Sequence, residues 1–387
     1  AEREAYWKPI GERLEAERVA AIAAAKKTLV DYEKAQAPKI AAAEKARLDA
    51  IAKQELALKT AERRLPRSQE AWEKSLAVKA DTVLWHPLKI TEAAAKASSP
   101  VKLTIENDGT TVFTVDGNAQ PTYSLTGETS LTNVTGIMLE VLPDERLPAF
   151  GPGLSSRNFV LTEFVLADAA SRAKKARKAP VAQKFSDAIA DVEQDAFGVK
   201  TAIDGKRDQG GQNGWAIGGK PGAHRAVFQL AKPVADKEGV ELKLDLVHVF
   251  RQGFSIGKFR IWVTEAPKPL SFGVPADIAA VVNTPAEKRT LAQWDVLDAY
   301  QRFTSPEFDK QLTALWNAKL PLPVDQQLVA LKTALTTTEL PITIDRTLLQ
   351  LRGDFEQSKL QVADKRLTVV QDLAWALMNS PAFLFNH

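Results

Sequence analysis

The feature that most constrains this chain is a long stretch without helix breakers. Residues 10–64 consist largely of Ala, Glu, Lys, Arg and Leu, and no glycine follows Gly11. These residue types are strong helix formers, so the stretch predicts one long helix or a helical hairpin. Pro38 is expected to kink or break it, because proline lacks a backbone N–H and clashes with the preceding turn. Pro66 lies in a related sequence context in heptad register, which favours antiparallel packing of a coiled coil.

A second helical region is predicted over residues 285–387. Its segments show helical spacing of apolar residues, and Asp325 and Asp345 stand at N-cap positions in a repeated pattern. The N-terminal arm, residues 1–80, is rich in alanine and offers only a thin core. Each arm has an apolar stripe but too few large residues for a core of its own, so the two arms are expected to pack together.

Between the helical regions the sequence changes to short β-rich runs. Apolar residues alternate in "VKLTI" and "VELKLDLV", and Asn-Asp-Gly and Asp-Gly pairs mark turns. Seven or more such runs predict an antiparallel β-sandwich of the jelly-roll type over residues 81–266. Three prolines and a glycine mark residues 267–284 as a linker. The predicted fold class is therefore α+β and multidomain, a β-sandwich flanked by helical, coiled-coil arms.

Composition excludes several classes of function. Lys and Arg number 51 against 48 Asp and Glu, a net charge of +3, and the basic cluster at 171–178 lacks interleaved aromatics, so nucleic acid is not an expected partner. The chain has no cysteine, which excludes disulfides, thiolate metal sites and covalent haem attachment. No run approaches the ~20 apolar residues of a membrane span, and the charged first residues do not read as a signal peptide. We expect either that a signal was removed or that the chain is a piece of a larger protein.

Several motifs resemble a family of large multidomain proteins. "QDLAWAL" and "FLFNH" near the C-terminus, and "VTGIMLEVLPDERLPAFGPG", "RNFVLTEFVLA" and "GKFRIWVTE" in the β-domain, are similar to segments of planctomycete cytochrome-c-associated proteins. The resemblance implies an exported protein, periplasmic or at the cell surface, whose haem-c domain lies upstream. This chain would then carry no haem, its partners would include the upstream domains, and the parent protein could be an oxidoreductase.

A second resemblance is to galactose-binding-like jelly rolls, also called discoidin domains. Their pattern is an Ala-x-Asp-Gly turn, a tryptophan, a strand ending in Phe-x-Leu, and a strand bearing a glutamate. The matching residues are 202–205, Trp215, 228–230 and 159–165. The order differs, because the strand with Glu163 precedes the Asp-Gly turn, as in a permuted member. The resemblance implies a non-catalytic carbohydrate-binding module that binds polysaccharide or oligosaccharide.

The candidate ligand residues lie on one glycine-rich loop, "NGWAIGGKPGAHRAVFQL". Trp215 has two interpretations: its ring stacks on a sugar, or it closes the end of the sandwich core. Asn213, His224 and Arg225 could hydrogen-bond the hydroxyl groups of a sugar. We expect His224, where a strand begins, to be half-exposed. No sequence motif supplies a carboxylate or nucleophile for a catalytic histidine, so the chain is not expected to be an enzyme.

Asp204 and Glu163 are the candidate metal ligands. In the galactose-binding-like modules that the chain resembles, calcium sits where an Asp-Gly loop meets the glutamate of a strand, and calcium prefers such oxygen ligands. The alternative is that Asp204 organises its own turn by accepting backbone N–H bonds. Three functions stay open: a carbohydrate-binding module accessory to a haem-bearing exported protein, a structural or partner-binding scaffold without a sugar ligand, and an enzyme acting on polysaccharide. The first is the preferred hypothesis.

Overall fold

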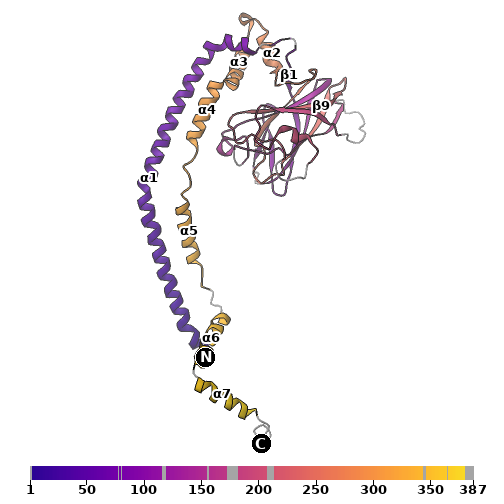
Figure 1. Cartoon of the computed structure of the whole chain (residues 1–387). Helices are drawn as coiled ribbons and strands as arrows, with labels where there is room; N and C mark the ends of the chain where they lie inside the picture. Colours follow the sequence, from indigo (N-terminus) through magenta and orange to yellow (C-terminus); the bar gives the residue numbers. More distant parts are fainter. Residues whose placement is uncertain are drawn as a thin grey trace. The chain divides into compact units, whose positions relative to one another are not determined.

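The computed structural model describes residues 2–76, 78–79, 81–115, 119–154, 157–171, 182–206, 213–342, 346–363 and 365–379. Over these residues the chain is α+β, with seven α-helices and two β-sheets (Figure 1). It divides into a helical unit, residues 1–43 with 322–387, and a sheet unit, residues 44–321. Asp345, most of the basic cluster at 171–178 and the "FLFNH" motif lie outside the described residues.

The N-terminal helix α1, Glu2–Leu76, is a single helix and not a hairpin (Figure 1). It runs without interruption through Pro38 and Pro66, so the expected break at Pro38 does not occur. A proline inside a helix costs about 3 kcal/mol, because one hydrogen bond is lost and the ring crowds the preceding turn. Tertiary contacts of α1 lie before Pro38, through Tyr32 with Asp325, and after it, where Arg47 donates to the Lys319 carbonyl at 3.3 Å.

In the helical unit, α1 packs against α5, Gln326–Glu339. The Tyr32 hydroxyl lies 2.9 and 3.1 Å from the carboxylate oxygens of Asp325, and Arg18 donates to the Glu339 carbonyl at 3.1 Å. The Asp325 carboxylate also accepts from the N–H groups of Gln327 and Leu328, both at 3.0 Å. The predicted N-cap at Asp325 is thereby confirmed. The unit also contains α6, Arg346–Ala363, and α7, Lys365–Met378.

The sheet unit contains two sheets whose pairs are antiparallel except for the parallel pair β1–β12. Among the described strands, the larger sheet has the order β12-β1-β11-β6-β9-β8, with β4 pairing β11 and β3 pairing β4, and the smaller has the order β2-β5-β10-β7. The strands are β1 Leu84–Pro87, β2 Lys89–Lys96, β3 Lys102–Ile105, β4 Thr111–Val115, β5 Thr122–Thr129, β6 Asn133–Val141, β7 Glu163–Ser171, β8 Phe185–Ala190, β9 His224–Ala235, β10 Val240–Val247, β11 Lys258–Thr264 and β12 Val274–Pro275.

One hydrophobic core lies between the two sheets, as in a sandwich. The alternation predicted for "VELKLDLV" is present, because Leu242, Leu244 and Leu246 of β10 are buried while the residues between them are half-buried. They join Phe228 of β9 and Ile261 of β11, from the other sheet, in the same cluster. Burial of apolar surface on both inner faces therefore holds the sheets together.

Short helices connect the sheets to the second half of α1. Residues 267–284, expected as a linker, contain strand β12 and helix α2, Ala276–Val282, because Val274 donates to the Val83 carbonyl at 2.9 Å. Then follow α3, Leu291–Thr304, and α4, Pro306–Lys319. Arg289 forms a two-pronged ion pair with Glu73 of α1, both distances 2.8 Å, and Trp72 donates to the Thr304 hydroxyl at 3.1 Å. The sheet unit thus includes part of both helical regions.

Candidate functional site

Trp215 lies in the core of the sandwich. Its side chain has no exposed surface, its indole Nε1 donates to the Val192 carbonyl at 2.8 Å, and its ring meets Phe159 edge-on with centroids 5.0 Å apart. Its backbone also pairs with Leu161 in both directions at 2.9 Å. Because the ring presents no face to solvent, stacking on a sugar is not open to Trp215 in this arrangement. Of the two interpretations of Trp215, the structure shows the one in which its ring belongs to the sandwich core.

Asn213 and Gly214 belong to the start of the same loop but not to the surroundings of His224. The Asn213 amide donates to the Lys206 carbonyl at 3.4 Å. Gly214 has φ +104°, and a Cβ placed on it would lie 2.4 Å from the Leu161 carbonyl oxygen. The glycine is therefore required by a close backbone approach, not by a ligand. The structure does not bring Asn213 to the cavity that His224 and Arg225 line.

His224 is buried, not half-exposed as the sequence suggested, because the loop that precedes β9 folds back over its ring. The Nε2 atom lies 3.3 Å from the Lys220 carbonyl and 3.2 Å from the Pro221 carbonyl. Both are acceptors, so we assign the hydrogen to Nε2. The Nδ1 atom faces Asp191, with 3.4 Å to its Oδ2. His224 therefore has a carboxylate neighbour, which no motif in the surrounding sequence predicted.

Arg225 is fixed by a buried carboxylate. Its Nε donates to Glu140 at 2.9 Å, and Glu140, 1% exposed, also accepts from Arg260 Nε at 2.9 Å and Trp262 Nε1 at 3.1 Å. The guanidinium lies over the Phe303 ring, 5.2 Å from its centroid. A buried carboxylate needs such donors, so Arg225 supports the structure as well as lining the cavity.

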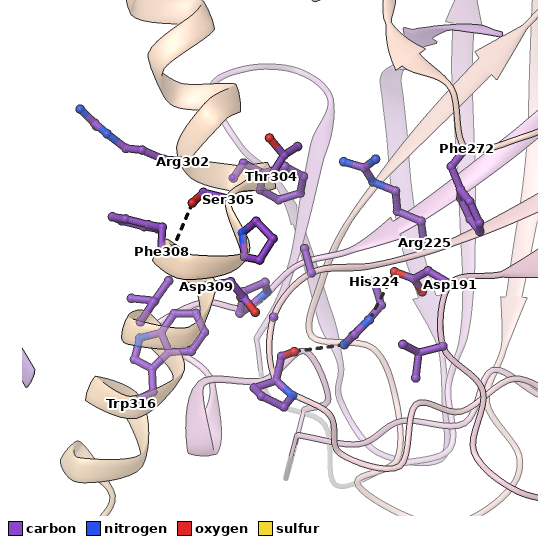
Figure 2. A pocket seen from close by; sticks show the side chains of 18 residues that line it. Asp191, His224, Arg225, Phe272, Arg302, Thr304, Ser305, Phe308, Asp309 and Trp316 are labelled. Carbon is purple, nitrogen blue, oxygen red and sulfur yellow. Dashed lines mark hydrogen bonds and ion pairs between the residues drawn. The ribbon is translucent and has the colours of Figure 1, made fainter. Parts of the chain in front are cut away.

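His224 and Arg225 line a cavity of about 640 Å³. Figure 2 shows His224, Arg225 and Asp191 on one side and the residues around the junction of α3 and α4 on the other. The junction contributes aromatic and polar side chains: Arg302, Phe303, Thr304, Ser305, Phe308, Asp309 and Trp316. Sequence reasoning missed Asp191, Asp309 and these aromatics, because they lie far from the loop along the chain and only the fold brings them near it.

Asp309, in the first turn of α4, also lines this cavity. Its Oδ1 would lie 3.0 Å from a Cβ placed on Gly222, so the carboxylate approaches the loop closely at a glycine. Partial burial raises the pKa of the Asp309 carboxyl, and attraction to His224 opposes that rise. Two carboxylates therefore lie on the side of His224: that of Asp191 in the β-domain and that of Asp309 in α4.

Asp204 and Glu163 do come together, at a second cavity of about 330 Å³ that both line. Glu163, 4% exposed, accepts from the Gly205 N–H at 2.9 Å. Asp204 accepts from the Lys206 N–H at 3.0 Å, and its other oxygen lies 3.3 Å from the Lys206 ammonium. Among the described residues no group of three or more His, Asp or Glu side chains could hold a metal ion. As they stand, both carboxylates accept backbone N–H groups, which is the arrangement of the turn-organising alternative.

Comparison with known proteins identifies neither of these sites. No protein family, curated protein or solved structure matches the chain. In the part of the chain that the structure describes, no helix combines the length and apolar character needed to cross a membrane.

Proposed function

We propose that the sheet unit binds carbohydrate in the cavity lined by His224 and catalyses no reaction there. The cavity carries this proposal, because its aromatic walls and convergent polar groups are the features that bind a pyranose ring. Phe303 is 36% exposed and Phe308 is half-buried, so both can offer ring faces, while Asp191 and Asp309 can bond hydroxyl groups. These residues replace Trp215 and Asn213 of the sequence-based hypothesis.

The surroundings of His224 support binding without catalysis. In the described residues its ring nitrogens meet only two carbonyls and the Asp191 carboxylate. Because both ring nitrogens face protein groups, this arrangement favours a role for His224 in holding the loop and Asp191 over proton transfer to a ligand.

The test is a titration of the whole chain with neutral oligosaccharides by calorimetry. We expect dissociation constants of about 0.1–1 mM, because shallow sugar sites gain little buried area. Phe308→Ala should weaken binding about three- to tenfold through loss of an aromatic contact. Phe355→Ala is the matched control, because Phe355 is 60% exposed on α6, outside the cavity. Unchanged affinity in Phe308→Ala, or no binding of any oligosaccharide by the parent chain, overturns the proposal.

The broader assignments belong to the same proposal. We assign the sandwich to the galactose-binding-like jelly rolls on the motifs at 202–205 and 159–165, and the chain to an exported, haem-bearing parent protein on its C-terminal motif. The two sheets with one shared core support the first assignment at the level of architecture. Separation of cell compartments followed by detection of the protein tests the second.

A partner-binding scaffold is a second candidate, favoured by exposed apolar side chains on α7. Val369, Leu373, Trp375 and Leu377 are between 58% and 68% exposed. Such a surface is typical of an interaction site. We take the upstream domains of the parent protein as its partner. Hydrogen exchange of residues 365–379 should slow when those domains are present, and equal exchange in both forms would remove this candidate.

A further inference from the structure

The charged side chains that line the His224 cavity differ in whether an opposite charge compensates them. The two arginines have carboxylate partners that do not line the cavity: Arg225 donates to Glu140 at 2.9 Å, and Arg302 Nη2 lies 3.3 Å from Glu62 Oε1. Asp309 is exposed at the surface and only attracted by His224. The positive charges are therefore largely compensated, whereas the Asp309 carboxylate keeps oxygens available to a ligand.

His224 offers the cavity no hydrogen-bond donor, because both of its ring nitrogens face protein groups. Its Nε2 hydrogen is directed at the Lys220 and Pro221 carbonyls. Its Nδ1 atom lies 3.4 Å from Asp191 Oδ2. Because the carboxylates of Asp191 and Asp309 line the same cavity, a ligand that brings several N–H donors and a positive charge fits it better than a neutral one.

We infer that the cavity selects ligands that carry a protonated amine, and that its carbohydrate ligands are amino sugars. The inference rests on the proposed carbohydrate-binding function and names its substrate class. The ammonium group lies between Asp309 and Asp191, where its three N–H donors meet carboxylate oxygens. The aromatic rings beside the carboxylates also favour a cation over a neutral group.

A buried donor supplies an independent observation. Trp316, 6% exposed, lines the same cavity, and in the described residues its indole Nε1 has no hydrogen-bond partner. Its ring is held by stacking on Phe150, with centroids 5.6 Å apart and planes 7° apart. A buried N–H without a partner is costly, so a ligand that accepts from it gains affinity. A sugar hydroxyl accepts such a bond while the amine of the same ring donates to the carboxylates.

The experiment compares glucosamine oligomers with N-acetylglucosamine oligomers of the same length, titrated into the whole chain by calorimetry. We expect the amine form to bind about tenfold more tightly, because it makes charge-assisted hydrogen bonds that the acetylated form cannot make. Asp309→Asn should remove about that tenfold preference, because the amide loses the negative charge that binds the ammonium group. The matched control is Asp354→Asn, an exposed aspartate of α6, which should change neither affinity.

The outcomes separate the two proposals. Equal binding of both oligomers, with weaker binding in Phe308→Ala, overturns the amine preference and leaves carbohydrate binding in place. A preference for the amine oligomer that survives Asp309→Asn overturns the placement of the ammonium group. Absence of binding by either oligomer, together with absence of binding by neutral oligosaccharides, overturns both.

Discussion

At the scale of single residues, His248 shows how burial couples stability to pH. It is 1% exposed, its Nδ1 lies 3.2 Å from the Pro121 carbonyl, and its ring lies 4.7 Å from that of Tyr123. Burial lowers the pKa of His248 from 6.5 to about 4, although the bond to Pro121 favours the charged form. The unfolded chain therefore binds more protons than the native one between these two values.

We predict that the free energy of unfolding falls as the pH is lowered from about 6.5 to about 4, by about 3 kcal/mol through His248. This contribution is fully present above the pKa of the unfolded state and is lost toward the pKa of the folded state. Urea unfolding at a series of pH values measures it. His248→Asn keeps a donor for Pro121 but does not titrate, so its stability should change less over this range. An identical pH dependence in the variant contradicts the assignment.

Asp204 has two interpretations, as a metal ligand or as a residue that organises its own turn, and one substitution tests them against each other. Its carboxylate accepts from the Lys206 N–H at 3.0 Å and lies 3.3 Å from the Lys206 ammonium, a cation that competes with calcium. We predict that Asp204→Ala lowers the melting temperature equally in calcium and in chelator, because loss of a turn hydrogen bond does not depend on metal. A loss seen only in calcium would instead show that a bound ion stabilises the native state by mass action.

At the scale of elements, local sequence patterns predicted what local interactions determine. Helix formers over 10–64 predicted helical structure there but left a hairpin open, alternation in "VELKLDLV" predicted β10, and Asp325 was identifiable as an N-cap. Continuation of α1 through Pro38 was not predictable, since the contacts that offset its cost come from distant helices. The pairing of Asp191 with His224 likewise depends on the Asp191 N–H donating to the Arg225 carbonyl at 3.0 Å.

The loop before β9 also shows why a glycine-rich stretch need not be a ligand platform. We predict that Gly214→Ala lowers the free energy of unfolding by about 2 kcal/mol or more, because its Cβ would meet the Leu161 carbonyl oxygen at 2.4 Å with φ at +104°. Gly109→Ala is the control: φ is +67° and nothing lies within 4 Å of its Cβ. Its cost should stay near ~1 kcal/mol. Equal losses in urea unfolding would refute the close-approach argument.

At the scale of the whole molecule, the two parts of α1 are held by different contacts, one set in each unit. The sheet unit has its own core, and residues 44–76 of α1 are anchored to it by the Arg289–Glu73 pair and the Trp72–Thr304 bond. The first part of α1 is instead contacted by α5, through Tyr32 with Asp325 and through Arg18 with Glu339. Truncation after Pro321 removes α5 and leaves the anchored part of α1 intact.

We predict that this truncated chain loses helical structure before Pro38 and retains the fold of its sheet unit. Helix can propagate from residues 44–76 toward the N-terminus only across Pro38, whose nitrogen donates no helical hydrogen bond and which costs about 3 kcal/mol. Circular dichroism at 222 nm should therefore fall by more than the removed helices account for, while tryptophan signals of the core stay unchanged. Pro38→Ala in the truncated chain should restore much of the lost signal, because the alanine lets the anchored helix extend through residues with high helix propensity. Full helicity of the truncated chain with Pro38 in place would show that α5 is not what holds this part of α1.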